Sequence, residues 1–192
     1  NTHWHGDHSG GNENMNSAGV IIVAHENVRT RMSSEQFIAA FNSKVPASPK
    51  GALPVVTFTE SVAFYNGGET IHVVHVPPAH TDGDALVHFV RGNTIHMGDN
   101  FFNGRYPFVD LSSGGSFEGV INAVNAAMPY VNDSTKVIPG HGPLAGKREL
   151  VAYRDVLTKI RDRVAALIKA GKTKEQVIAA KPSAEWDATW GT

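Results

Sequence analysis

The chain contains no cysteine and no long apolar run. Without cysteine, disulfide bridges and thiolate metal ligands are excluded, and the redox compartment stays open. No apolar stretch approaches the roughly 18 residues that a transmembrane helix needs, and no basic, apolar targeting segment stands at the start. The net charge of −1 supplies no basic field for nucleic acid, although a local patch can hide within a neutral total. We therefore expect a small-molecule substrate and neither nucleic acid nor membrane as partner.

The 192 residues, of which 41% are hydrophobic and 18% charged, can bury the core of one domain spanning 1–192. Strand-like apolar runs alternate with helical patterns, as in a layered α/β protein. Strands are predicted at 20–24, 55–59, 61–65, 69–76, 85–90, 94–97 and 135–138. Helices are predicted at 26–41 with a break near 33–34, at 116–131, at about 150–168, and after a capping box at Thr173 and Gln176. The segment 42–54, with three prolines, is either a surface connection or a mobile flap beside a site.

Ligand-type side chains crowd the first residues, NTHWHGDHSGG. The pattern is His3-x-His5-x-Asp7-His8, and the glycines at 6, 10 and 11 predict a tight loop rather than a regular helix or strand. A loop lets adjacent side chains converge, whereas a strand sends them to opposite faces. Taken alone, the cluster fits a chance polar loop or an expression-tag remnant as well as a metal site.

Three further ligand-type residues follow predicted strands: His80 in VPPAHTDGD, Asp99 in IHMGDN and His141 in VIPGHG. In layered α/β proteins, functional sites form where strands end at one rim of a sheet. Together with the opening cluster these positions supply five histidines and two aspartates. That set is too large for one tetrahedral zinc ion, and it suits two ions that share a bridging carboxylate and a bridging hydroxide.

At these residues the sequence resembles the metallo-β-lactamase superfamily. The motif, His80, Asp99 and His141 stand in the family's order, with separations of 75 residues from His5 to His80, then 19, then 42. The resemblance implies that His3, His5 and His80 hold one metal, that Asp7, His8 and His141 hold a second, and that Asp99 bridges them. It further implies the αββα sandwich fold and two Zn²⁺ per chain, with other divalent metals also compatible.

The activity that the resemblance implies is hydrolysis of an ester, thioester, lactone or lactam by a metal-bridging hydroxide, with Asp7 as catalytic residue. Asp99 matches the glyoxalase II-like and lactonase-like branches, whereas the zinc β-lactamases nearest in spacing place a cysteine there, so β-lactamase activity is a lesser alternative. The other alternative is a metal-binding domain that is catalytically silent in a truncated form.

Family members carry several strands before the histidine motif, so we expect the chain to be a fragment that lacks much of the first sheet. The expected consequences are that no strand anchors His3 and His5, and that an exposed sheet edge favours a homo-oligomer. Any signal peptide would precede the first residue, which leaves periplasmic and cytoplasmic locations both open.

Further residues are assigned around the predicted metals. Thr81 and Asp84 are candidates to hydrogen-bond the ligand imidazoles, and the alternative is that Asp82 and Asp84 shape a turn before the strand at Ala85. The aromatic residues after Asp99 either line an apolar substrate wall or fill the gap between sheet and helix; they are Phe101, Phe102, Tyr106 and Phe108. The remaining histidines are expected to be packed or surface residues; they are His25, His72, His75, His88 and His96.

Overall fold

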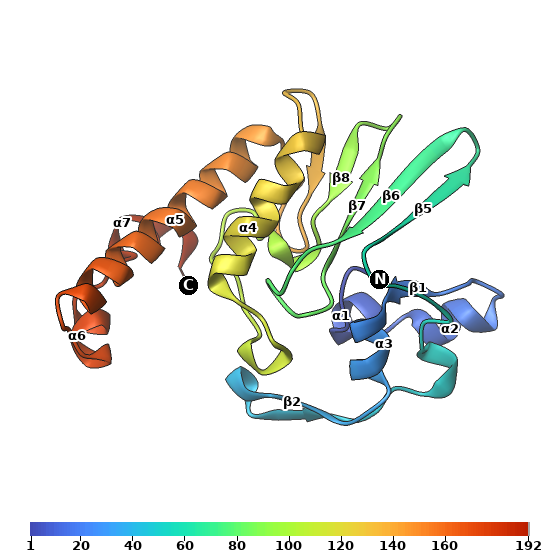
Figure 1. Cartoon of the computed structure of the whole chain (residues 1–192), viewed down its shortest axis with the longest axis horizontal. Coiled ribbons are helices and arrows are strands. Elements are labelled where there is room, and N and C mark those ends of the chain that lie inside the picture. Colours follow the sequence, from blue (N-terminus) through green and yellow to red (C-terminus); the bar gives the residue numbers. More distant parts are fainter. Residues whose placement is uncertain (192) are drawn as a thin grey trace.

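The computed structural model, which describes residues 1–191, is organised around a five-stranded sheet (Figure 1). Its strands follow one another in the order β5-β6-β7-β8-β9. They are β5 (Ser61–Asn66), β6 (Glu69–His75), β7 (Ala85–Phe89), β8 (Thr94–His96) and β9 (Lys136–Ile138). The first four are successive antiparallel neighbours, and β9 pairs with β8 in parallel after a helical crossover. Each of these strands was predicted from the sequence to within about two residues.

The glycines between β5 and β6 explain that hairpin. Gly67 and Gly68 have φ of +56° and +79°, the left-handed conformation that a two-residue hairpin turn requires and that glycine adopts without steric cost. The resulting register places Asn66 opposite Glu69 and Ser61 opposite Val74.

Two helices cover one face of this sheet, α4 (Phe117–Ala127) and α5 (Lys147–Lys169) (Figure 1). The Ser116 hydroxyl caps α4 by accepting a hydrogen bond from the Gly119 amide at 3.1 Å. The main core lies between sheet and helices, where Leu86 and Ile95 of the strands meet Leu150 and Leu157 of α5. Burying each such side chain stabilises the fold by about 1.5–3 kcal/mol.

The first sixty residues form a second, smaller layer. Its elements are α1 (Gly6–Ser9), α2 (Asn12–Ser17), β1 (Val23–His25), α3 (Glu26–Met32), β2 (Gln36–Ile38), β3 (Ser43–Val45) and β4 (Val56–Phe58). Strand β1 pairs with β4 in parallel, and β2 pairs with β3 as a hairpin.

Two predictions for this layer are corrected. The helix predicted at 26–41 ends at Met32, because the residues beyond the Ser33–Ser34 break pair with β3 as a strand. The strand predicted at 20–24 is reduced to β1, since Val20 and Ile21 lie in water, 45% and 66% exposed.

The chain ends in a helical arm. The second half of α5 projects past the sheet and is followed by α6 (Lys174–Ala179) and α7 (Ala184–Trp190) (Figure 1). The predicted capping box of α6 is confirmed, because Thr173 and Gln176 each bond to the other's backbone amide. Helix α7 was not predicted; its Trp190 packs on Tyr106 and Tyr153. Within residues 1–191, none of the helices has the length and apolar character needed to cross a membrane.

Candidate metal centre

Hydrogen bonds made by Asn1, Thr2 and Trp4 hold the histidine motif in place. The Thr2 carbonyl accepts a hydrogen bond from Ala85 N at 2.9 Å, and the Asn1 ammonium donates to the Val23 carbonyl at 2.8 Å. The Trp4 indole, only 4% exposed, donates to Ser113 Oγ at 3.1 Å. These bonds supply the anchorage that the sequence led us not to expect.

The motif itself is partly helical, which corrects the predicted loop. Residues Gly6–Ser9 form the single turn α1, closed by a hydrogen bond from Gly10 N to Gly6 O at 2.7 Å. A Cβ on Gly10 would lie 2.5 Å from that same oxygen, so only glycine permits this closure. The glycines therefore tighten a helical turn here instead of preventing one.

The other three predicted ligands follow strands at one rim of the five-stranded sheet. His80 lies in the loop after β6, Asp99 in a 3-10 turn after β8, and His141 just after β9. A Cβ on Gly140 would lie 2.0 Å from Asp99 Oδ1, so the loop before His141 can pass this close to Asp99 only with glycine at that position.

The structure brings all seven predicted ligands together in two groups. The ligand atoms of His3, His5 and His80 lie within 4.8 Å of one another, and so do those of Asp7, His8, Asp99 and His141. Their grouping coincides with the assignment expected from the sequence, while metal binding itself stays a prediction.

Asp99 stands between the two groups. Its Oδ1 is 3.0 Å from His8 Nε2, and its Oδ2 is 3.2 Å from His141 Nε2 and 3.6 Å from His80 Nε2. His3 Nε2 lies 4.0 Å from the same Oδ2. One carboxylate thus reaches both groups, as a bridging ligand must.

The chemistry of the donor set fits two divalent ions. His3 Nε2, His8 Nε2 and Asp99 Oδ1 are buried and have no partner with hydrogen-bond geometry, even though the last two atoms are only 3.0 Å apart. Buried polar atoms in native proteins are almost always satisfied, so three orphans in one cluster indicate a missing partner. Imidazole nitrogen and carboxylate oxygen are donors that zinc and iron both accept.

Burial holds two of these histidines in the neutral, ligating form. Burial, assisted by repulsion from the neighbouring imidazoles, lowers the pKa of His3 well below its usual value. Burial also lowers the pKa of His80 to about 4, and Asp99 only partly opposes it. Burial acts in the same direction on His8, but Asp99 and Asp7 outweigh it and raise that pKa. Since metals bind unprotonated imidazole, His3 and His80 are prepared for an ion at neutral pH.

A carboxylate that the sequence analysis missed orients His5. Asp110, 1% exposed, places Oδ2 3.0 Å from His5 Nε2 and receives the backbone amides of Ser112 and Ser113 on Oδ1. Burial raises the pKa of Asp110, but the hydrogen bonds from His5 and from the Ser112 and Ser113 hydroxyls outweigh burial and keep that pKa far below its usual range. The available signal was the sequence Asp110-Leu111-Ser112-Ser113, since an aspartate two and three residues before serines is typical of a side chain that caps a turn.

The two residues predicted for this supporting role bond to each other instead. Asp84 accepts hydrogen bonds from the Thr81 amide at 2.9 Å and the Thr81 hydroxyl at 2.6 Å, and burial raises its pKa to about 7. For Asp84 the structure supports the alternative, a role in the turn before β7, whereas the Asp82 carboxylate pairs with Arg31 at 2.7 Å. His80 is oriented by the Phe108 carbonyl, 2.8 Å from its Nδ1.

A pocket of about 400 Å³ opens directly on the two groups. Of the four aromatic residues proposed for it, Phe102 and Phe108 line its wall. Phe101 is fully buried in the main core, and the Tyr106 hydroxyl donates to Asp187 at 2.8 Å instead. The sequence missed Arg105, which adds a guanidinium to the rim.

The opposite wall of the pocket comes from the β2–β3 hairpin, through Ile38, Phe41 and Val45. Phe41 is 64% exposed and its ring lies 4.9 Å from that of Phe108. Of the segment 42–54, Val45 lines this pocket, so the segment touches the site at that residue, and its role as a mobile flap stays a prediction.

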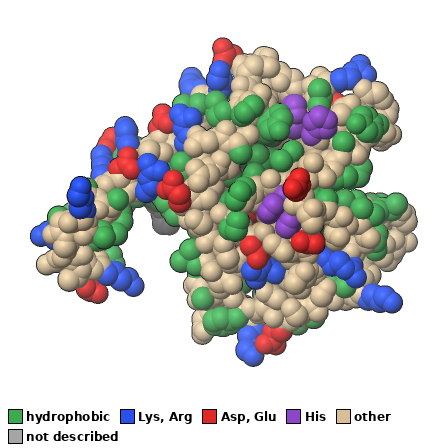
Figure 2. Space-filling model, viewed as in Figure 1, with side chains coloured by type: hydrophobic (Ala, Val, Ile, Leu, Met, Phe, Trp, Pro, Cys, Tyr) green, Lys and Arg blue, Asp and Glu red, His purple; other side chains and the backbone are tan. Residues whose placement is uncertain are grey.

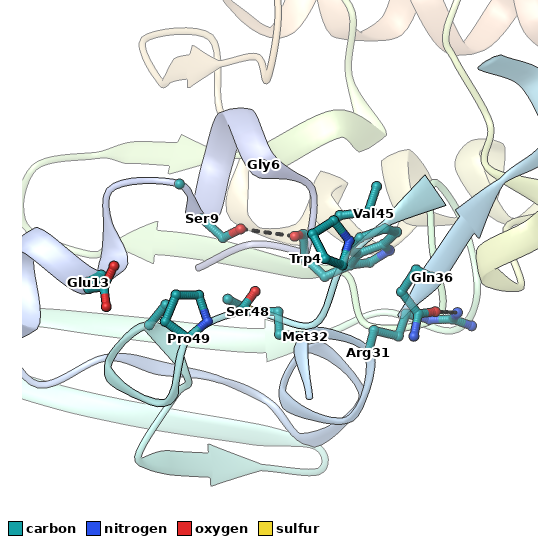
Figure 3. Close-up of a pocket in the computed structure, with 13 residues that line it drawn as sticks. Trp4, Gly6, Ser9, Glu13, Arg31, Met32, Gln36, Val45, Ser48 and Pro49 are labelled. Carbon is teal, nitrogen blue, oxygen red and sulfur yellow. Dashed lines mark hydrogen bonds between the residues drawn. The ribbon is translucent and has the colours of Figure 1, made fainter. Parts of the chain in front are cut away.

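A smaller cavity, about 160 Å³, lies beside the first and shares Trp4, Gly6 and Val45 with it (Figure 3). The Ser9 hydroxyl at its edge donates to the Trp4 carbonyl at 2.9 Å.

The five histidines predicted to be packed or surface residues belong to neither ligand group. Among them, His25 stacks on His75 with ring centroids 3.8 Å apart.

Comparison with known proteins places these features in a family. The family model described as "Metallo-beta-lactamase superfamily" matches residues 1–158. No curated protein matches the sequence.

Solved structures share the fold at low identity. A metallo-beta-lactamase from Pontibacter korlensis is 24% identical with a TM-score of 0.62, over 82% of this chain and 66% of that one. The BLEG-1 B3 metallo-beta-lactamase is 20% identical with a TM-score of 0.66, over 82% and 75%. TTHA1623, solved in a di-iron-bound form, is 22% identical with a TM-score of 0.58, over 76% and 69%. The chain thus spans slightly under two thirds of the Pontibacter protein's length.

Proposed function

We propose, since the chain belongs to the metallo-beta-lactamase superfamily, that it is a metal-dependent hydrolase with a dinuclear, zinc-preferring site. The observation that carries the proposal is the position of Asp99 between two groups of ligand atoms at the floor of an open pocket. Divalent ions held there would supply Lewis acidity and activate water near neutral pH. Iron is the alternative metal, because TTHA1623 was solved with two iron ions.

Within this proposal the chain's own groups divide the work. Asp7 is 56% exposed and its Oδ2 lies 3.2 Å from both His8 Nε2 and His141 Nε2, so it can orient a water and hand a proton to the leaving group. Phe102 and Phe108 offer an apolar wall to the acyl part of the substrate and exclude bulk water. We expect an ester, thioester, lactone or lactam, since each has a carbonyl that water can attack.

Among these substrates, lactams form a separate class to test, because the Pontibacter korlensis and BLEG-1 proteins that share this fold are metallo-beta-lactamases. The third reading is a metal-binding chain without turnover, and the same experiment separates all three.

The test combines metal analysis with a substrate screen. Protein purified without chelator is assayed for metal content by mass spectrometry, and for hydrolysis of a chromogenic ester, a thioester, an acyl lactone and a chromogenic β-lactam. We expect about two ions per chain and turnover that chelation abolishes and zinc restores. Asp99→Asn should lose the ions and the turnover together, whereas Asp133→Asn, a carboxylate that is 92% exposed beside Lys147, should change neither. Two ions without turnover would support the silent reading, and no bound ion would overturn both.

A further inference from the structure

The helical arm lies outside the part of the chain that the family model describes. The match ends at residue 158, within α5, and the similar structures described above cover at most 82% of the chain. Residues 159–192 carry seven lysine and arginine residues against four acidic ones, whereas residues 1–158 carry ten against fourteen. The near-neutral total of the chain therefore conceals a cationic arm of net charge +3 attached to an anionic body of net charge −4.

The positive charge at the end of the arm is not neutralised locally. The arginines of α5 are paired with carboxylates: Arg148 with Glu149, Arg154 with Asp155, Arg161 with Glu118 and Asp162, and Arg163 with Glu185. By contrast, Lys169, Lys172, Lys174 and Lys181 have no carboxylate within 4.0 Å among residues 1–191. The only acidic residue in their segment is Glu175. We call residues 167–181 the arm tip, and Figure 2 shows blue side chains outnumbering red ones there.

The same tip exposes aliphatic side chains. Ile168 at the end of α5 is 61% exposed, and Ile178 on α6 is 63% exposed. Helix α6 has no buried residue; Val177 is half-buried, and Ile178 is left in water. Lys174 and Ile178 are four residues apart, which places both on one face of α6. The arm tip thus combines two exposed aliphatic side chains with lysines that have no carboxylate within 4.0 Å, a combination that fits a partner both anionic and apolar.

We propose that the arm tip docks on the surface of an anionic lipid membrane. Lysines adjacent to a negatively charged lipid surface gain attraction from its potential, while short aliphatic side chains enter the interface without spanning it. A second copy of the tip is a poor occupant, because two tips of equal charge repel. Nucleic acid would satisfy the lysines but would leave Ile168 and Ile178 in water. The 23 residues of α5, about 34 Å of helix, would hold the tip away from the pocket.

The test is co-sedimentation of the full chain with vesicles of phosphatidylcholine alone and of phosphatidylcholine with 30 mol% phosphatidylglycerol. We expect binding to the second composition only, lost at high salt. Lys169→Gln/Lys172→Gln/Lys174→Gln should weaken it on the order of 100-fold, since each lysine contributes about 5-fold. The matched control Lys44→Gln/Lys50→Gln/Lys136→Gln removes equal charge from the body and should bind as the wild type does. Ile168→Ser/Ile178→Ser should weaken binding with the charge unchanged.

Three outcomes would overturn the proposal. One is the absence of binding to the anionic vesicles, and another is an equal loss in the control variant, which would indicate a response to total charge only. The third is a pair of results: the protein binds duplex DNA and loses that binding in the lysine variant only, and the isoleucine variant binds the anionic vesicles as well as the wild type does. Circular dichroism of each variant confirms that α5 and α6 are retained.

Discussion

The carboxylate of Asp110 offers a sharp test of how this chain would hold a metal. Its Oδ1 receives the amides of Ser112 and Ser113 at 3.1 and 3.2 Å, and its Oδ2 lies 3.0 Å from His5 Nε2. In Asp110→Asn the amide oxygen can keep both backbone bonds, which places the NH₂ group against His5. Because that group cannot accept a proton, His5 must carry its proton on Nδ1, the nitrogen that faces His80 at 2.9 Å.

The expected effect is on metal affinity rather than on the fold. A protonated Nδ1 cannot ligate, so the ion of the His3, His5 and His80 group should bind about 10–100-fold more weakly, or about 1.4–2.8 kcal/mol. In metal-free protein, the free energy of unfolding should fall by only about 1 kcal/mol, because the hydrogen bonds from the Ser112 and Ser113 amides are retained. Competition with a chromophoric zinc chelator at pH 7.5 measures both ions; one should stay tight while the other weakens.

Asp84→Asn is the matched control, because that carboxylate is as buried as Asp110 but bonds to Thr81 and to no imidazole. It should leave both zinc affinities unchanged. An Asp110→Asn protein with two wild-type affinities, or an equal loss in Asp84→Asn, would refute the reasoning that Asp110 sets the tautomer of His5.

Three further predictions concern the glycine beside the bridge, a buried imidazole and the core. Gly140→Ala places a Cβ 2.0 Å from Asp99 Oδ1 and should reduce bound metal, measured by mass spectrometry, below one ion per chain. Burial, assisted by His75, lowers the folded-state pKa of His25. The contribution of His25 to stability is therefore present above about pH 6.5 and is lost as the pH falls below that value. Urea unfolding at pH 7.5 and 5.5 should show a smaller difference in unfolding free energy for His25→Gln than for the wild type. Leu157→Ala should cost about 2–5 kcal/mol in the same assay, since Leu157 is fully buried.

The convergence of the candidate ligands was predictable from sequence because the positions of several of them follow local patterns. His80, Asp99 and His141 each lie three to five residues after the end of a strand, and such positions lie at the rim of a sheet, where sites of layered α/β proteins form. The turns and caps were predictable for the same reason: Gly67–Gly68 and Ser116 act within a few residues of themselves.

The parts that could not be predicted depend on partners distant in sequence. Asp110 reaches His5 across 105 residues, and no pattern near either residue reveals that contact. Residues 36–38 read as helix because their strand character comes from pairing with β3. Phe101 and Phe102 are neighbours of identical type, yet one enters the core and the other the pocket, since the chain alternates its side chains there.

The cluster of orphaned atoms couples the site to the stability of the whole fold. His3 Nε2 is buried without a hydrogen-bond partner, which costs the metal-free protein about 1–3 kcal/mol, whereas His8 Nε2 and Asp99 Oδ1 lie 3.0 Å apart and partly offset each other's cost. Ions bound at 100 times their dissociation constant would add about 2.7 kcal/mol each. Calorimetry should therefore show a Tm higher by roughly 5–10 °C in zinc than in chelator for one such ion, and more for two. Asp99→Ala, which lacks the shared ligand, should abolish most of that difference. Equal Tm values for the wild type in zinc and in chelator would mean that the seven side chains converge without holding a metal.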